Sequence, residues 1–152
     1  MPFNKKILIS SCLLGKKVRY DGLIKDYDIL LLENYQLVDC CPEVDGGLPI
    51  PRPPSEIQVN GKVFDNNGID VTDKFNCGAN MALKLVVNEN IKIAILKSKS
   101  PSCSNKMVYD GTFSGVLIRG IGVTTKVLEQ NGIKVFDENE IEKALAYLSA
   151  LK

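Results

Sequence analysis

The stretch KILISSC at residues 6–12 joins a short, continuous apolar run to a cysteine that directly follows it. Such a run is typical of a strand that is buried on both faces of a parallel sheet. It predicts a first strand over residues 6–11, and similar runs predict strands over residues 37–40, 91–96 and 133–136. Strands that alternate with helical segments favour a parallel sheet. We therefore expect an α/β fold, a three-layer Rossmann-like domain with a mainly parallel sheet.

The segments between these strands carry helix and turn signals. Apolar residues recur every three or four positions over residues 71–86, which predicts one buried face of a helix. Helices are predicted at residues 26–34, 72–88 and 120–130, and after Asp137. Asn60-Gly61 predicts the tight turn of a small β-hairpin insertion over residues 57–64, because both residues tolerate positive φ angles. No linker or repeat interrupts the pattern, so we expect residues 1–152 to form a single α/β domain.

The composition excludes several classes of chemistry. The 152-residue chain has no histidine, so a histidine general base, a Ser-His-Asp triad, a Cys-His pair and a histidine-containing zinc site are all excluded. Its net charge is +1 with mixed signs, which does not indicate a large nucleic-acid surface. The five cysteines are an odd number, and no secretion leader or membrane-spanning run is recognised. We expect a cytoplasmic protein whose reduced thiols are available for metal binding or catalysis.

Three of the cysteines follow predicted strands. Cys12 comes after the first strand, Cys41 after the second, and Cys103 after the third, across the link of residues 97–102. The carboxyl ends of parallel strands share one edge of the sheet, which is where open α/β folds build their sites. We therefore expect these three thiols to lie close together.

The remaining two cysteines, Cys40 and Cys77, are expected to stand apart, because Cys40 alternates away from its neighbour in a strand and Cys77 lies within a helix. Thiolates are soft ligands that suit iron-sulfur clusters. A structural zinc would need Cys40, Cys77 or a carboxylate as its fourth ligand. Two further interpretations are a non-catalytic metal- or cluster-binding module and a cofactor-free enzyme with Cys12 or Cys103 as its nucleophile.

Seven short motifs are distributed over nearly the whole chain: SCLLG at residues 11–15, VRYDG at 18–22, CPEV at 41–44, GGLP at 46–49, PRPP at 51–54, SPSC at 100–103 and YDGTF at 109–113. In these motifs the chain resembles the family named domain of unknown function 523. Some members of that family are thiouracil desulfidases that hold a 4Fe-4S cluster through three cysteines. A larger relative with an added domain acts on 2-thiouridine in tRNA.

The resemblance implies roles for particular residues. It implies a 4Fe-4S cluster with one open iron, held by Cys12, Cys41 and Cys103. Glu43 and Ser100 match the polar residues that have catalytic roles in the family. The chain departs from the family pattern at two positions, Ser104, where glycine is expected, and Asp45, where an apolar residue is common.

Charged residues in the neighbouring loops are candidates for substrate binding. Arg19 and Arg52 lie beside the expected site and are suited to hold an anionic or carbonyl-bearing substrate. Asp21 and Asp110 belong to predicted tight turns that border the pocket. We expect an iron-sulfur-dependent desulfidase that converts a thiolated pyrimidine such as 2-thiouracil to its oxo form. Because no added RNA-binding domain is present, a free nucleobase is favoured over tRNA as the substrate. We also expect a monomer that does not associate with a membrane.

Overall fold

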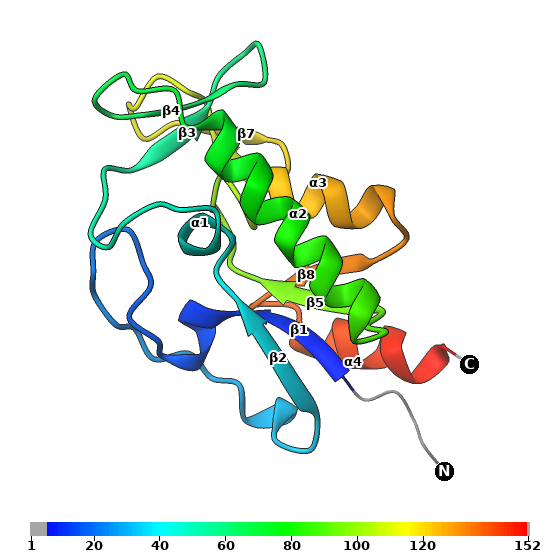
Figure 1. Cartoon of the computed structure of the whole chain (residues 1–152). Coiled ribbons are helices and arrows are strands. Elements are labelled where there is room, and N and C mark those ends of the chain that lie inside the picture. The colour runs from blue at the N-terminus through cyan, green and yellow to red at the C-terminus, as the bar shows by residue number, and fades with distance from the viewer. Residues whose placement is uncertain (1–5, 152) are drawn as a thin grey trace.

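A four-stranded sheet forms the centre of the computed structural model, which describes residues 6–151 (Figure 1). Its strands lie in the order β2-β1-β5-β8, and every neighbouring pair is parallel. Their bounds are Lys6–Ser10 for β1, Gln36–Cys40 for β2, Ile93–Leu96 for β5 and Lys134–Asp137 for β8. The predicted parallel sheet is confirmed, and each strand lies close to its expected position.

Helices cover both faces of the sheet. On one face lie α2 (Thr72–Asn88) and α3 (Val123–Gln130), and on the other lie α4 (Ile141–Ala150) and the 3-10 helices η1 (Ser11–Leu14) and η2 (Leu30–Leu32). Alternate strand residues enter the two cores, since successive side chains point to opposite faces. Leu8 packs with Ala82 and Val86 of α2, whereas Ile7 packs with Ile141 of α4. This arrangement confirms the three-layer α/β fold.

The predicted helix at residues 26–34 is wrong, because only the short η2 forms there. Leu32 is buried, whereas Leu30 and Leu31 are 69% and 54% exposed. An isolated short helix is marginal in water and needs an apolar face packed against the core. This segment buries one leucine, which does not provide such a face.

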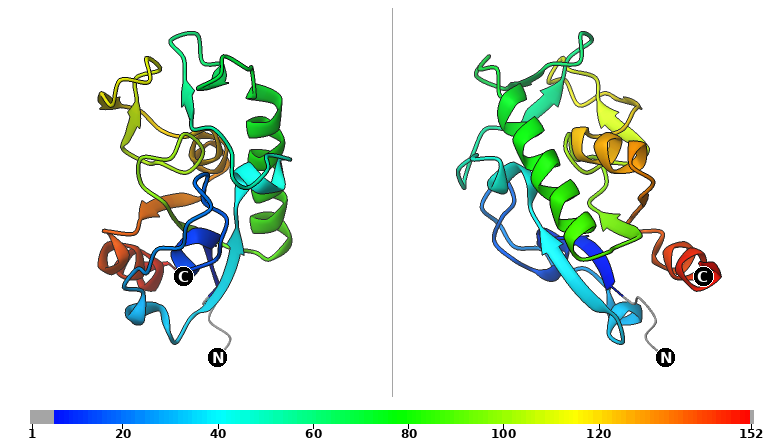
Figure 2. Two further views of the ribbon diagram at one scale, coloured as in Figure 1. Left: turned by 90° about the vertical axis from the view of Figure 1, so that its left-hand side faces the viewer. Right: turned by 45° about the vertical axis from the view of Figure 1, so that its right-hand side comes forward.

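Two antiparallel hairpins lie together at one end of the molecule (Figure 2). The first pairs β3 (Ser55–Ile57) with β4 (Val63–Asp65), and the second pairs β6 (Met107–Tyr109) with β7 (Leu117–Arg119). The first hairpin is confirmed, although only Gly61 of its predicted turn has a positive φ angle. The second has no counterpart among the predicted elements, because its strands have three residues each and show no alternation that a sequence pattern detects.

A close backbone contact joins α2 to the short helix α1 (Pro42–Asp45), which follows β2. Gly78 of α2 packs against α1 so closely that a Cβ atom there would lie 1.8 Å from the Pro42 carbonyl oxygen. Gly46, after α1, makes the reciprocal approach, since its Cβ would lie 2.0 Å from the Lys74 carbonyl oxygen. The position of α1 therefore depends on glycine at both contacts. Over residues 6–151, no helix is long and apolar enough to span a bilayer.

We expect Gly78→Ala to lower the free energy of unfolding by about 2–3 kcal/mol, because the added methyl group overlaps backbone atoms that have no room to move. Thermal or urea denaturation measures this change. Asn80→Ala is the matched control, since Asn80 is exposed on the same helix and alanine favours helix. Equal stability of the two variants would contradict the contact.

Candidate functional site

A pocket of about 570 Å³ lies at the carboxyl edge of the sheet, where β1, β2 and β5 end. Such an edge is the usual position of sites in open α/β sheets. Cys12, Cys41 and Cys103 all line this pocket. The structure thus brings the three cysteines that follow strands to one cavity, and all three are free thiols.

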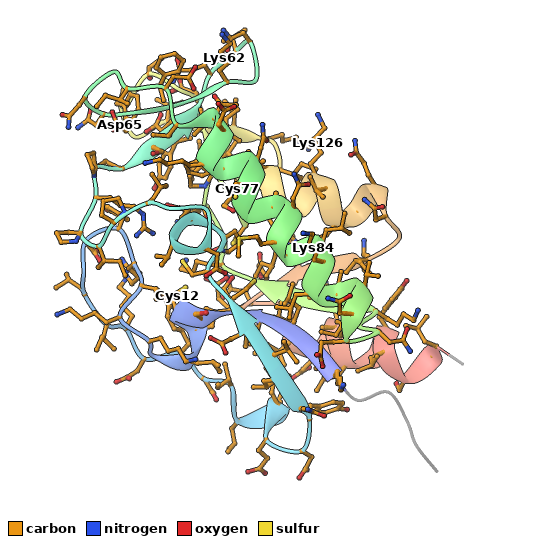
Figure 3. The ribbon with its side chains drawn as sticks, viewed as in Figure 1. Cys12, Lys62, Asp65, Cys77, Lys84 and Lys126 are labelled. Carbon is orange, nitrogen blue, oxygen red and sulfur yellow. The ribbon has the colours of Figure 1, made fainter. Side chains whose placement is uncertain are left out.

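Cys12 and Cys41 are positioned by the ends of two paired strands. Ser10 of β1 is in register with Cys40 of β2, so the chain leaves the sheet at the same level in both strands. Cys12 then lies in η1 (Figure 3), and Cys41 is the N-terminal cap of α1. Ser11 donates a hydrogen bond of 2.6 Å to Asp39, which ties η1 to β2.

Cys103 lies in a turn that Ser100 stabilises. The Ser100 hydroxyl oxygen accepts hydrogen bonds from the backbone amides of Ser102 at 3.1 Å and Cys103 at 3.0 Å. This is the local side-chain-to-backbone bonding that serine favours in turns. Ser100 also lines the pocket, and among residues 6–151 its hydroxyl oxygen acts only as an acceptor. The residue therefore has a structural role that is compatible with a second role toward a substrate.

The amino end of α3 holds the same turn. The amides of Val123 and Thr124 donate to the carbonyl oxygens of Pro101 and Ser102, and the Thr125 hydroxyl donates to the carbonyl oxygen of Cys103. The first amides of a helix have no partner within it, so this loop satisfies them. The loop that contains Cys103 therefore caps the amino end of α3, and these hydrogen bonds fix the backbone of Cys103.

Burial raises the pKa values of all three thiols, and neighbouring thiols add to the effect at Cys12 and Cys103. Burial raises the pKa of Cys12 to about 11, with an added contribution from the nearby Cys41. Burial raises the pKa of Cys103 to about 12, with added contributions from Cys41 and Cys12. Burial also raises the pKa of Cys41. A free cysteine nucleophile needs a lowered pKa, so these thiols do not have the environment of a cofactor-free thiol enzyme.

The thiols do not form a site for a single metal ion. Among residues 6–151, no group of three Cys, Asp or Glu side chains is placed to hold one ion. A tetrahedral zinc site with Zn–S bonds of about 2.3 Å would bring its sulfur atoms to about 3.8 Å from each other. A structural zinc would need its ligands to come that close to one another.

The expectation that Cys40 stands apart is wrong. Cys40 also lines the pocket, and it is 5% exposed in the same core cluster as Cys103. The reason is that β2 ends at Cys40, so the alternation of a strand does not continue into Cys41. Cys77, in contrast, is exposed on α2 and does not line the pocket (Figure 3).

We expect iodoacetamide to label Cys77 of the metal-free protein long before Cys12 at pH 8. With a pKa of about 11, only about one thousandth of the Cys12 thiols are ionised at that pH, and the thiolate is the reactive form. The labelling rate of Cys12 should rise roughly tenfold for each pH unit between about 8 and 10. Mass spectrometry of the labelled peptides measures both rates, and equal labelling at pH 8 would contradict the raised pKa.

Glu43 lines the pocket from the first turn of α1, two residues after Cys41. The Arg52 side chain, 4% exposed, donates from Nε to Glu43 Oε1 at 3.0 Å, and the Glu43 side chain is 15% exposed. The same guanidinium donates to the carbonyl oxygens of Pro49 and Val18. Within residues 6–151 this carboxylate accepts its side-chain hydrogen bond at Oε1, which leaves Oε2 open to a ligand in the pocket. Arg52 therefore holds Glu43 in one orientation.

The predicted substrate-binding residues differ in their relation to the cavity. Arg52 and Arg19 both line the pocket, and Arg19 donates to both oxygens of Asp21 and to the Tyr27 hydroxyl. Asp21 and Asp110 are not among the lining residues. Asp21 supports Arg19, and Asp110 accepts hydrogen bonds from Thr112 within its own turn.

Several lining residues are not among the site residues that the sequence predicts. Lys97 follows β5 directly and pairs with Glu138 at 3.0 Å, and Glu138 also accepts hydrogen bonds from the Ser98 amide and hydroxyl. Glu56 of β3 lines the pocket, together with Phe113 of the loop between β6 and β7. The position of Lys97 at a strand end is a signal that could have identified it. Phe113 ends the motif YDGTF, which is a signal that could have identified it, whereas Glu56 depends on contacts between distant segments.

The two departures from the family pattern do not line the pocket. Ser104 is buried, and its hydroxyl donates to the Met107 carbonyl oxygen at the start of β6. Burial raises the pKa of Asp45 at the end of α1.

The comparisons with known proteins agree with this geometry. A family model described as 2-thiouracil desulfurase matches residues 7–140. The chain is 39% identical over 150 residues to protein YbbK of Bacillus subtilis (strain 168), with 91% of this chain and 99% of YbbK covered. The solved structure of the 4Fe-4S-dependent thiouracil desulfidase TudS is 43% identical, with a TM-score of 0.90 and 97% of this chain and 99% of TudS covered. The resemblance is thus confirmed, and the chain belongs to the 2-thiouracil desulfurase family.

Proposed function

We propose that this protein is an iron-sulfur-dependent desulfidase that converts a thiolated pyrimidine such as 2-thiouracil to the oxo form and releases sulfide. The observation that carries this proposal is the pocket that Cys12, Cys41 and Cys103 line together. The family match and the similarity to TudS support the same reaction. The reaction consumes one water molecule, replaces C=S by C=O and needs no net electron transfer.

The donor set fits a 4Fe-4S cluster held by Cys12, Cys41 and Cys103. Thiolates are the ligands of such clusters, and Cys41 is near enough to the other two thiols to contribute to the raised pKa values of both. The pocket wall also carries more cationic than acidic side chains, and this excess offsets part of the negative charge of three thiolates, since Arg19 and Lys97 also pair with Asp21 and Glu138. The cationic residues are Arg19, Lys25, Arg52, Lys97 and Lys99, and the acidic ones are Glu43 and Glu56. When bound through three cysteines, the cluster supplies one iron with Lewis-acid character toward the thiocarbonyl sulfur.

Glu43 acts as the general base in this proposal. Its Oε2 atom accepts a proton from the water that attacks the thiocarbonyl carbon, while Arg52 fixes Oε1 at 3.0 Å. Pro42 stiffens the link between Glu43 and Cys41, so the carboxylate and the thiol keep a fixed relation. Ser100 uses its free hydroxyl proton to orient a substrate oxygen or ring nitrogen, because its oxygen already accepts two amide protons.

Arg19 and Arg52 bind the substrate from the pocket wall, and Asp21, which does not line the pocket, acts through Arg19. Asp21 aligns Arg19 through two hydrogen bonds at 3.2 and 3.0 Å. The proposed substrate is a free thiolated nucleobase. We further propose that residues 1–152 form a single domain and that the protein acts as a monomer in the cytoplasm.

Anaerobic reconstitution with iron and sulfide, followed by a sulfide-release assay with 2-thiouracil, tests this function. We expect visible absorption of an iron-sulfur cluster and stoichiometric formation of uracil and sulfide. Turnover by the metal-free protein at the same rate would contradict the need for a cluster. A loaded protein that binds 2-thiouracil without releasing sulfide would support a non-catalytic module instead.

A further inference from the structure

The loop between β6 and β7 is held at the pocket by one buried carboxyl group. Glu56 of β3 is 7% exposed, and its Oε1 atom accepts hydrogen bonds from the amides of Gly111 at 2.9 Å and Phe113 at 3.1 Å. Both amides belong to the loop, which is distant from β3 in the sequence. A buried carboxyl group with two amide partners is a strong and specific clamp. It fixes the backbone on either side of Thr112.

Two further contacts hold this loop against the first hairpin. Gln58 donates from Nε2 to the Gly111 carbonyl oxygen at 3.1 Å. Gly111 itself approaches β3 so closely that a Cβ atom would lie 2.8 Å from the Ile57 carbonyl oxygen, and its φ angle is +95°. The two hairpins therefore form one unit at this end of the molecule (Figure 2).

Packing in the apolar core does not explain the unusual backbone of Phe113. Its φ angle is +57°, a conformation that is rare for a bulky residue and that persists where surrounding contacts enforce it. The side chain is half-buried and belongs to none of the three apolar core clusters within residues 6–151. Instead it lines the pocket. The enforced backbone thus presents an aromatic residue to the cavity.

We propose that Phe113, held in place by Glu56, is the surface on which the planar ring of the substrate stacks. This inference rests on the proposed function and adds the residue that binds the pyrimidine face. A flat conjugated ring gains affinity from an aromatic partner, and such stacking is tolerant of ring substituents. Glu56 is a positioning residue, because it acts through the Gly111 and Phe113 amides. The polar side chains of the pocket then contact the edge of the ring, and Phe113 contacts its face.

The first experiment compares Phe113→Ala and Phe113→Leu, both loaded with cluster. We expect Phe113→Ala to raise the Kd for 2-thiouracil, measured by anaerobic calorimetry, and the KM for sulfide release by roughly 10-fold. The iron content and kcat should stay within about twofold of wild type, because binding is lost without loss of the reacting groups. Phe113→Leu keeps apolar bulk without a π face, so it should recover only part of the affinity.

The second experiment compares Glu56→Ala with Glu56→Gln. The glutamine amide oxygen still accepts both amide protons, so Glu56→Gln should keep the wild-type KM and Kd. Glu56→Ala releases the loop and should raise both values to the level of Phe113→Ala. The double variant with Phe113→Ala should then show little further loss, because the two residues act through one contact.

The outcomes separate this inference from the proposed function. If wild type binds 2-thiouracil without turnover, while Phe113→Ala binds roughly 10-fold more weakly, the stacking surface stands and the catalytic proposal fails. If wild type is active and Phe113→Ala keeps its Kd and KM, the stacking surface is overturned and the catalytic proposal stands. A loss of kcat in Glu56→Gln would overturn the positioning role, because it would mean that Glu56 exchanges a proton.

Discussion

Cys103→Ala is expected to reduce the iron content of the anaerobically reconstituted protein at least about 10-fold and to abolish its visible absorption. Loss of one thiolate from a three-thiolate site removes an anchor and a negative charge that stabilises the metal. The backbone of Cys103 is held independently by Ser100 and Thr125, so the substitution should leave the fold intact. Iron analysis, visible spectra and circular dichroism together measure the effect.

Two cysteines outside the proposed ligand set provide matched controls for this result. Cys77 is exposed on α2 and does not line the pocket, so Cys77→Ser should keep its iron. Cys40 is the stricter control, because it lines the same pocket and is as deeply buried as Cys103. We expect Cys40→Ala to keep its iron as well. Wild-type iron in Cys103→Ala, or loss of iron in Cys40→Ala, would contradict the proposed ligand set.

Glu43→Gln is expected to slow sulfide release by roughly 100-fold or more while the cluster is retained. Glutamine has the same shape and can still accept the hydrogen bond that Arg52 donates to Oε1, but it cannot take a proton from water. The loss should therefore appear in kcat, with little change in iron content or in the Kd for 2-thiouracil. Steady-state sulfide release and anaerobic calorimetry measure these quantities.

Ser100→Ala is the companion variant for Glu43→Gln. Ser100→Ala should slow sulfide release less than Glu43→Gln does, because Ser100 orients a substrate oxygen or ring nitrogen and does not accept the proton from water. Part of its effect should come from the Cys103 turn, because the substitution removes the oxygen that accepts hydrogen bonds from the Ser102 and Cys103 amides. Near-wild-type sulfide release by an iron-replete Glu43→Gln protein would exclude this base, and Glu56, the other carboxylate that lines the pocket, would then be the one to test.

Local patterns were sufficient to predict the sheet and the helix α2. The apolar run before Cys12 and the three- to four-residue periodicity of Thr72–Asn88 each describe one element and the face that it buries. The same approach was wrong for residues 26–34, where Leu32 is buried but Leu30 and Leu31 are exposed and only the short η2 forms. It also missed the hairpin of β6 and β7, whose strands are too short to show a period.

The site divides in the same way between sequence and structure. The sequence by itself determined that three cysteines follow strands. Because strands alternate with helices, the strands are parallel, and their carboxyl ends therefore place the three cysteines at one edge of the sheet. Only the tertiary structure decided that Cys40 shares their pocket, that Arg52 fixes Glu43, and that Glu56 clamps the loop of Phe113. These contacts join segments that are distant in the chain, and their partners are chosen by loop geometry and burial. A periodic pattern records which face of an element is buried, but it does not record which distant side chain packs against it.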